Sequence, residues 1–394
     1  TIALVYAILS GFWGVVVTDL VQFCIAIFGS IALAIIALNH VGGMEKLLFK
    51  LSQLMGSDAI HENTLKFVPP IPEAALNTST FWESPFSKFL IFITVMWWSH
   101  HGTDGGGYII QRMSSAKNER HALLATLWFN LAHYALRVWP WILVAVVSIV
   151  MFPMIPESYS DLGVKAGYPL VMNTLLGPGL KGILIVSFLA AFMSTIDTHL
   201  NWGASYLIND IYKRFFKPSE SERHYVLVSK IITVILMILA AFTALKMQSI
   251  SKAWEFIFSM GAGIGLVLIL RWFWWRINAW SEITALATSI LITISLEFIA
   301  WSQTVSAGNQ YSLFGTAPVL FGITLQVHHK LMIIVPLAII AWVSATFLTS
   351  PEPIGHLKVF YERVQPGGWW APVTKGFEHT AQPVSKGILI QWFA

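Results

Sequence analysis

Charged residues are scarce in this sequence. Asp, Glu, Lys and Arg make up 11% of its 394 residues, whereas soluble domains contain about 25%. The net charge of +4 is too small to indicate a nucleic-acid partner, and a disulfide scaffold is excluded because Cys24 is the only cysteine. Apolar residues are in excess, since 56% of the chain is hydrophobic and its mean hydropathy is +0.67. This composition excludes a disordered or collagen-like chain and indicates an integral membrane protein.

Apolar stretches long enough to cross a membrane recur along the chain. A hydrocarbon core of roughly 30 Å requires about 20 helical residues. Unpaired backbone groups are unfavourable in lipid, so only helices or closed barrels can span it, and the alternating pattern of barrel strands is absent here. We therefore predict an all-α fold with about eight complete transmembrane helices, at residues 16–38, 86–110, 121–152, 180–209, 225–247, 253–275, 281–303 and 330–349. The shorter apolar runs at 1–9 and 387–394 predict truncated helices at both ends, so we expect this chain, 1–394, to be a fragment of a single transmembrane domain.

Arginine is unevenly distributed over the predicted connections. If successive connections alternate between the two sides of the membrane, one side receives seven of the eight arginines, although the other carries nine lysines. Positive residues favour cytoplasmic connections. We therefore predict that the 39–87 connection is extracellular and that the 350–386 connection is cytoplasmic. The arginines that support this orientation are Arg112, Arg120, Arg214, Arg223, Arg271, Arg276 and Arg363.

The stretch from Trp97 to Tyr108 is unusual for a membrane span. It combines four glycines with several polar side chains, which weakens a helix and exposes backbone carbonyls. In transporters, a helix broken at mid-membrane lines a cavity and binds solute or ion. The alternative is a flexible loop at the end of a helix. The adjacent His100 and His101 are a weak indication of a metal site, because no third ligand is evident.

Hydroxyl and small side chains form a stripe on the 180–209 helix. Spacings of three and four residues place Ala191, Ser194, Thr195, Thr198 and Ser205 on one face. Their oxygens suit a hard, weakly charged cation, but small residues also favour close helix packing, with hydroxyls bonded back to carbonyls. Asp197 favours the ion site, since an ionisable group at membrane depth suggests a functional role.

Two further groups of polar residues lie within predicted spans. His133 and Arg137 are four residues apart on one helical face, and Arg137 requires a partner such as Asp104 or an anionic solute, unless it reaches outward to the interface. Asp19 begins the 16–38 helix, where it or Thr18 could cap the helix or line a cation path. No nucleophile elbow or zinc pattern is present, and the glycines at 105–107 lack the Lys-Ser/Thr of a phosphate loop. We therefore expect neither an enzyme nor a cofactor.

Four sequence blocks together resemble the sodium:solute symporter family. They occur in the family's order and cover residues 13–282: Trp13 to Gln22, Tyr108 to Lys117, Ala190 to Lys213, and Trp272 to Glu282. The resemblance implies a leucine-transporter-like bundle, in which two inverted repeats of five helices surround a site at the membrane midplane.

The resemblance also implies sodium ligands. Ala191, Ser194 and Thr195 match the positions that supply a carbonyl and two hydroxyls to the family's shared sodium site. The other half of that site comes from the family's first core helix, which we expect this chain to lack. Some members bind a second sodium through an acidic residue at the Asp19 position, with Asp197 and Thr198 as the corresponding groups on the sodium helix.

The expected solute contacts differ from those of sugar-transporting members. We align Ser99 and Gly102 with their substrate-contacting Asn and gating Tyr, and His133 with a substrate-contacting Lys. Trp254 and Glu255 fall near a substrate-contacting Gln. With Asp104, these residues predict a site between the helix broken near 99–107 and the helix that carries His133. Arg137 favours a solute with a carboxylate, such as a sugar acid.

We therefore expect a sodium-coupled symporter of the plasma membrane, with several membrane spans. It would bring a small polar organic solute into the cell by alternating access, with sodium and the lipid bilayer as its other partners and no nucleic acid. The alternative is a transporter-like sensor domain fused to a signalling protein. A membrane hydrolase or metalloenzyme built on His100, His101 and Asp104 is the least favoured interpretation.

Overall fold

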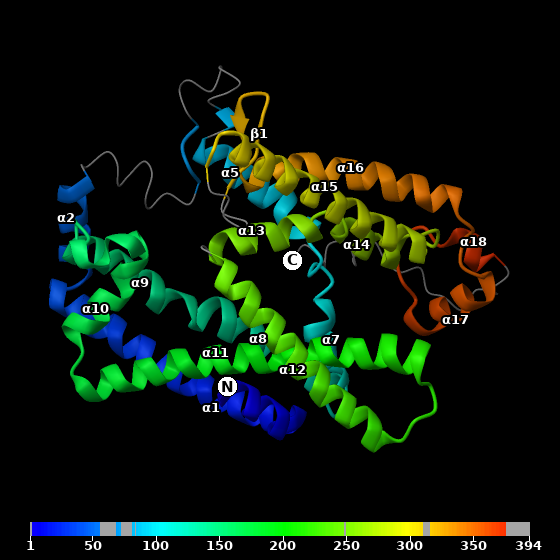
Figure 1. The fold of residues 1–394 in the computed structure, drawn as a ribbon, viewed down its shortest axis with the longest axis horizontal. Helices are drawn as coiled ribbons and strands as arrows, with labels where there is room; N and C mark the ends of the chain where they lie inside the picture. Colours follow the sequence, from blue (N-terminus) through cyan, green and yellow to red (C-terminus); the bar gives the residue numbers. More distant parts are fainter. Residues whose placement is uncertain are drawn as a thin grey trace. The chain divides into compact units, whose positions relative to one another are not determined.

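The computed structural model describes residues 2–55, 68–71, 81–82, 84–247, 250–309 and 316–375. Helices dominate these ranges (Figure 1). The elements before residue 178 are α1 (Ile2–Val41), α2 (Met44–Met55), α5 (Pro85–Ile91), the π-helix η2 (Phe92–Met96), α6 (Trp97–Ser99), α7 (Gly106–Ser114), α8 (Glu119–Asn130), the π-helix η3 (Leu131–Leu136), α9 (Val138–Met151), the 3-10 helix η4 (Glu157–Ala166) and α10 (Gly167–Leu175).

The second half continues with α11 (Pro178–Tyr206), the π-helix η5 (Leu207–Phe216), α12 (Glu222–Lys246), α13 (Ile250–Gly261), α14 (Gly265–Phe273), α15 (Ala279–Ser306), β1 (Val319–Leu320), β2 (Ile323–Thr324), α16 (Val327–Leu348), α17 (Ile354–Val364) and α18 (Ala371–Thr374). The strands β1 and β2 form an antiparallel hairpin, which the sequence pattern did not predict.

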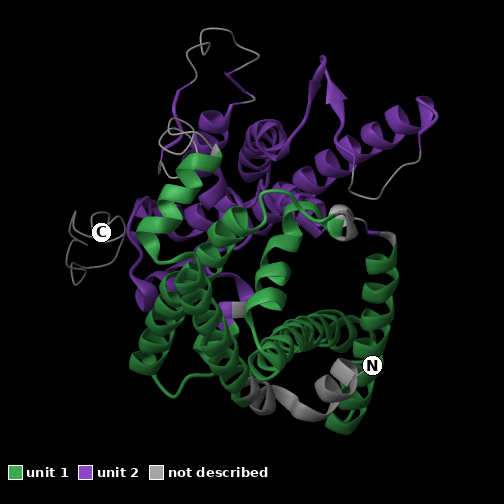
Figure 2. Cartoon of the chain, turned by 90° about the vertical axis from the view of Figure 1, so that its left-hand side faces the viewer, with its two compact units in different colours: residues 1–67, 111–245 green, residues 68–110, 246–394 purple. Residues whose placement is uncertain are grey.

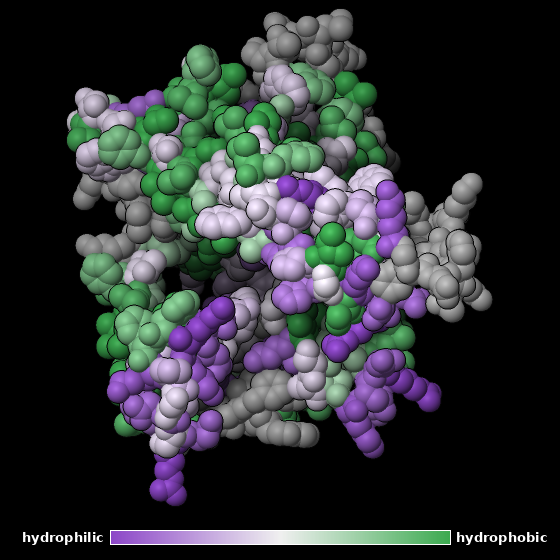
Figure 3. Space-filling model, turned by 90° about the vertical axis from the view of Figure 1, so that its right-hand side faces the viewer, coloured by the Kyte–Doolittle hydropathy of each residue, from purple (hydrophilic) through white to green (hydrophobic). Residues whose placement is uncertain are grey.

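Seven helical stretches in the described ranges are long and apolar enough to cross a membrane: Asp19–Val41, Glu119–Met151, Pro178–Phe216, Glu222–Leu245, Ile250–Phe273, Ala279–Ser306 and Val327–Leu348. Hydrophobic residues cover large parts of the surface in the space-filling view (Figure 3). Exposed side chains on the spans, such as Phe28, Ile238 and Phe298, are suited to contact with lipid.

The predicted helix at 86–110 is interrupted, and it is not among the seven candidate spans of the described residues, where about eight were predicted. The segment is divided into α5, η2 and α6, a turn, and then α7. The turn ends at Gly105 and Gly106, whose φ angles of +90° and +62° disfavour residues with a Cβ. The structure therefore contains the helix break that the glycine-rich stretch predicted.

The N-terminal prediction also needs correction. The apolar run at 1–9 does not form a separate truncated helix, because α1 continues without interruption from Ile2 to Val41. Asp19 consequently lies inside a helix, and its predicted role as an N-terminal cap is wrong. The apolar run at 387–394 lies outside the described residues.

The chain forms two compact units (Figure 2). Unit 1 contains residues 1–67 and 111–245, and unit 2 contains residues 68–110 and 246–394. In unit 1, α1 packs against α9, α10 and α11 around a core that includes Leu33, Val144 and Leu184. The Trp141 indole donates a hydrogen bond to Ser30 Oγ (3.1 Å), which ties α9 to α1.

Unit 2 contains a second interruption at residues 262–264, where α13 ends and α14 begins. A Cβ at Gly265 would lie 2.0 Å from the carbonyl oxygen of Trp98, so glycine allows α14 to contact the backbone of the first break. The core beside it contains Val267, Ala285 and Trp342. The two breaks are therefore packed against one another within unit 2.

Residues 350–375 attach to the C-terminal end of α14. The Trp369 N–H donates to the carbonyl of Phe273 (2.6 Å), and the Trp370 indole donates to the carbonyl of Trp272 (3.1 Å). Gly368 permits this contact, since a Cβ there would lie 2.4 Å from the Phe273 oxygen. This part of the 350–386 connection is an ordered strap.

Replacing Gly263 by alanine tests the packing of the second break. The added Cβ would lie 2.1 Å from Ser289 Oγ and 2.3 Å from Ala338 Cβ, so α15 and α16 would have to move. We expect a loss of about 1–3 kcal/mol in stability, measured as a lower thermal unfolding midpoint of the purified protein. Gly355→Ala on α17 is the matched control, because its Cβ meets nothing within 4 Å. Equal midpoints for the two variants would contradict this packing.

Candidate functional site

The predicted sodium stripe lies on α11. Ala191 and Thr195 are exposed within this chain, and Ser194 is half-buried. The Thr195 hydroxyl donates to the carbonyl of Ala191 (2.9 Å), so two of the predicted ligand oxygens are adjacent on the helix surface. An ion that used both oxygens would replace this hydrogen bond, because the hydroxyl proton would have to turn away from the cation.

Asp19 of α1 meets the same part of α11. The Ser194 hydroxyl donates a short hydrogen bond to the Asp19 carboxylate, across 175 residues of sequence. This contact joins a residue of the first predicted sodium site to one from the second. A carboxylate at this depth is unfavourable without partners, and a hydroxyl supplies one of them.

The other residues predicted for a second sodium have partners of their own. Asp197 is completely buried, and its carboxylate accepts a hydrogen bond from Asn201 (2.8 Å). Thr198 is also buried, and Arg112 Nη2 donates to its hydroxyl at 3.5 Å. Arg112 was not predicted as a site residue, although it belongs to one of the four blocks that carry the family resemblance.

His133 and Arg137 meet as their four-residue spacing predicted. Arg137 Nη2 lies 3.1 Å from His133 Nε2, and the guanidinium carbon lies 5.2 Å from the centre of the Trp141 ring. His133 belongs to η3, and Arg137 follows it directly. Pro140 lacks an N–H group to donate back into the preceding turn, which favours this local widening of the helix. Such π-helical segments are frequent at functional sites.

Arg137 has no acidic partner within the described part of unit 1. Its Nε is buried without a hydrogen bond, and its contacts are with His133 and Trp141. Asp104, which the sequence offered as its partner, pairs with Arg271 inside unit 2. The Arg137 guanidinium therefore keeps donor capacity that a carboxylate could use.

The turn of the broken helix is held by its own polar groups. The His100 ring accepts a hydrogen bond from the Gly102 N–H (2.9 Å), and the Thr103 hydroxyl donates to the Trp98 carbonyl (2.8 Å). Ser99 is fully buried, and its hydroxyl has no hydrogen-bond partner among the described residues. Of the groups predicted to contact solute in this segment, Ser99 is thus the one with unused hydrogen-bonding capacity.

Asp104 takes part in a charged triad. Arg271 Nη2 lies 2.6 Å from its Oδ2, and Arg271 Nη1 lies 3.1 Å from Glu282 Oε1. The second oxygen of Asp104 accepts the Gly106 N–H (3.0 Å), at the start of α7. The carboxylate is therefore fully engaged in joining the turn to α14.

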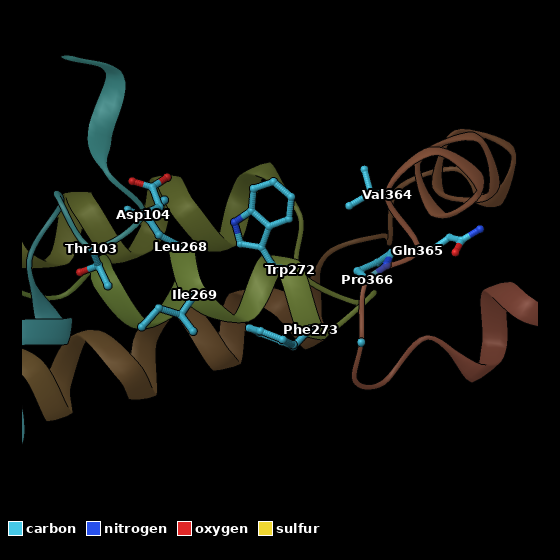
Figure 4. Close-up of a pocket in the computed structure, with 10 residues that line it drawn as sticks. Thr103, Asp104, Leu268, Ile269, Trp272, Phe273, Val364, Gln365 and Pro366 are labelled. Carbon is cyan, nitrogen blue, oxygen red and sulfur yellow. The ribbon is translucent and has the colours of Figure 1, made fainter. Parts of the chain in front are cut away.

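A cavity of about 520 Å³ lies beside this triad (Figure 4). Thr103 and Asp104 lie at one end, side chains of α14 such as Trp272 line its length, and residues 364–367 close the other end. The cavity consequently joins the broken-helix turn to the strap that follows α17.

Trp254 and Glu255 lie on α13. The Trp254 ring is 5.6 Å from Phe258, which is 6.3 Å from His100, so aromatic contacts connect α13 to the broken-helix turn. Glu255 pairs with Lys252 (2.9 Å). His133 and Arg137 belong to unit 1, whereas Ser99, Gly102, Asp104, Trp254 and Glu255 belong to unit 2. Among the described residues, no cluster of three or more His, Cys, Asp or Glu side chains could hold a metal.

The model of the sodium:solute symporter family matches residues 1–291, and the chain belongs to this family. It is 26% identical to a sodium/mannose cotransporter of Bos taurus, over 76% of this chain and 53% of the relative. It is 23% identical to the osmoregulated proline transporter of Bacillus subtilis, over 75% of this chain and 56% of the relative. It is 25% identical to the sodium/glucose cotransporter of Vibrio parahaemolyticus, over 81% of this chain and 59% of the relative. The chain thus spans little more than half the length of these relatives.

A solved structure shows the same fold. The chain aligns with a Na+-coupled sialic acid symporter in a substrate-bound, outward-open state, with a TM-score of 0.55 and 18% sequence identity, over 89% of this chain and 65% of that one. The predicted all-α, leucine-transporter-like fold is confirmed. Together with the seven candidate spans, family membership establishes a multi-pass membrane protein.

A double-mutant cycle on Asp104 and Arg271 tests the charged triad. Asp104→Asn leaves Arg271 paired with Glu282 alone, Arg271→Gln leaves both carboxylates without their cation, and the double variant removes the Asp104–Arg271 pair. We expect a coupling of about 1–3 kcal/mol in thermal stability. Lys213 and Glu222 provide the control cycle, because this pair is longer (3.9 Å), its side chains are 44% and 88% exposed, and its coupling should be near zero. Similar coupling in both cycles would contradict a stabilising role for the triad.

Proposed function

We propose that this chain forms much of a sodium-coupled symporter, which brings a small polar organic solute into the cell by alternating access. The observation that carries the proposal is the group of oxygens on α11, where the Ala191 carbonyl and the Thr195 hydroxyl are adjacent and exposed and Ser194 is bonded to Asp19. The similar proteins from Bos taurus and Vibrio parahaemolyticus, named as sodium cotransporters of mannose and glucose, support the same activity.

The chemistry of these oxygens suits an alkali cation. Hard cations prefer carbonyl, hydroxyl and carboxylate oxygens. Ala191, Ser194 and Thr195 would supply neutral ligands, and the Asp19 carboxylate would supply a negative charge beside them. Sodium entry is favoured by roughly 2.3 kcal/mol per charge for each 100 mV of membrane potential. Binding can drive transport because it shifts the population toward the conformation that binds sodium better.

A second sodium would use Asp19, Asp197 and Thr198. Asp197 is a buried carboxylate at the depth where a cation would be stabilised. Arg112 brings a positive charge to the hydroxyl of Thr198 and would weaken binding of another cation there. We therefore propose that sodium affinity at this position depends on where the Arg112 side chain lies.

The solute is proposed to carry a carboxylate, as sugar acids do. Arg137 has donor groups without an acidic partner among the described residues of unit 1, and His133 lies against it. Ser99, Gly102, Trp254 and Glu255 are the candidate contacts in unit 2. Asp104 is better suited to holding the broken helix, because Arg271 neutralises it. Similar proteins are named for mannose, proline and sialic acid, which are all small and polar.

Replacing Ser194 and Thr195 together by alanine tests the sodium site. Loss of two hydroxyl ligands should raise the sodium concentration for half-maximal uptake by about tenfold or more. Uptake by the full-length protein in proteoliposomes is the measurement. Ser205→Ala, on the same helix, is the control, because the Ser205 hydroxyl bonds to the Trp202 carbonyl. An unchanged sodium dependence in the double variant would exclude this site.

Arg137→Gln tests the carboxylate preference. Removing the guanidinium should reduce the affinity for a carboxylate-bearing solute by roughly 10–100-fold, while neutral analogues change little. Arg137→Lys should restore part of the affinity, because it keeps the charge but not the two-pronged geometry. Competition by paired acidic and neutral solutes gives the readout, and Arg363→Gln on exposed α17 is the control. Equal losses for acidic and neutral solutes would contradict this role.

A further inference from the structure

Arg137 is held by groups that leave its charge in place. Its Nη2 lies 3.1 Å from His133 Nε2, and its guanidinium carbon lies 5.2 Å from the centre of the Trp141 ring. A guanidinium can only donate hydrogen bonds, so His133 Nε2 accepts and this imidazole is neutral. The face of an indole attracts a cation although it carries no net negative charge. The two contacts therefore fix the guanidinium without neutralising it.

Arg271 of unit 2 shows what acidic partners change. Its guanidinium carbon also lies near an indole, 6.0 Å from the centre of the Trp272 ring. Its Nη2 and Nη1 are paired with Asp104 and Glu282, at 2.6 and 3.1 Å. A solute carboxylate would have to displace one of these groups to reach Arg271. It would displace no carboxylate among the described residues of unit 1 to reach Arg137, so the aromatic contact prepares this side chain for an anion.

Trp141 is itself fixed from a second helix. Its indole on α9 donates to Ser30 Oγ on α1 (3.1 Å). Ser30 is 3% exposed, whereas Trp141 is 40% exposed. The adjacent Gly29 lets α1 lie against α11, since a Cβ there would be 3.0 Å from the Leu184 side chain. The indole is thus bonded to a closely packed part of unit 1 at its N–H group, while its ring remains beside the guanidinium.

We infer that Trp141 and Ser30 are positioning residues for Arg137. Ser30 fixes the indole, and the indole holds the guanidinium with its charge and remaining donor groups available to the carboxylate of the solute. The inference rests on the proposed function, in which Arg137 binds that carboxylate. Because both residues act through Arg137, their loss should weaken the binding of acidic solutes alone, and only when Arg137 is present.

Binding of two acidic sugars, glucuronate and N-acetylneuraminate, and of two neutral sugars, glucose and mannose, to the purified full-length protein tests this inference. Trp141→Leu removes the aromatic face and should weaken binding of the acids by about tenfold. Ser30→Ala leaves the indole without its acceptor and should weaken it by about threefold. Affinity for the neutral sugars should not change. Trp139→Leu is the matched control, because Trp139 is also on α9 and is 42% exposed.

The same measurements in an Arg137→Gln background separate positioning from a structural role. Adding Trp141→Leu to Arg137→Gln should produce no further loss of acid affinity, because the residue through which Trp141 acts is already missing. An equal loss in both backgrounds would overturn the inference, and so would equal losses for acidic and neutral sugars. If Trp141→Leu does not fold, Trp141→Phe, which keeps a ring but removes the N–H donor, and Ser30→Ala decide the question.

Failure of the inference can be distinguished from failure of the proposed function. If the acid preference is lost in Arg137→Gln but is fully kept in the Trp141 and Ser30 variants, the positioning role is wrong and the proposed solute class stands. If the unmodified protein prefers neither acid over the neutral sugars, or keeps its preference in Arg137→Gln, the proposed solute class is wrong and this inference fails with it.

Discussion

Backbone groups in the membrane must be paired, and this requirement determines where the chain can depart from a helix. At the first break, the carbonyl of Trp98 accepts from Thr103, and the N–H of Gly102 donates to His100. At the second break, glycine lets α14 lie directly against the backbone of Trp98 and Ser99. Side chains thus replace missing helical hydrogen bonds at the first break, and close packing buries the second. Unit 2 can contain irregular backbone within a membrane because its backbone is bonded to side chains or buried by packing.

Charges follow the same rule, because an isolated charge in a low-dielectric medium is unfavourable. Asp104 is held by Arg271, Lys330 by Glu297, and Asp19 accepts a hydrogen bond from Ser194. Arg137 differs, since its contacts in the described part of unit 1 are a histidine and the face of a tryptophan. Polar groups that already have hydrogen-bond or ionic partners in the protein stabilise the fold. A group with unused hydrogen-bonding capacity is the better candidate for binding solute. Arg137 and Ser99 have such unused capacity, whereas Asp104 is already paired.

The proposed ion site illustrates how one set of residues can serve packing and function. Ser194 links α11 to α1 through Asp19, and Thr195 bonds to Ala191 within α11. Both hydrogen bonds involve oxygens that could instead contact a cation. The energetic difference between the two arrangements is therefore smaller than the full value of ion binding, which would favour reversible binding of the proposed sodium ion.

The sequence alone was sufficient for the membrane location, the all-helical class, the break near residue 100 and the proximity of His133 to Arg137. These features depend on composition or on helical spacing, which are local properties. Tertiary structure decided that α1 continues through residues 2–15, that α13 and α14 separate at residues 262–264, and that Asp104 pairs with Arg271 across 167 residues. It also determined that Arg112 donates a hydrogen bond to Thr198. Helical periodicity defines which residues share a face of one helix. Which other helix packs against that face depends on contacts between segments far apart in the sequence, and the pattern of a single helix does not contain this information.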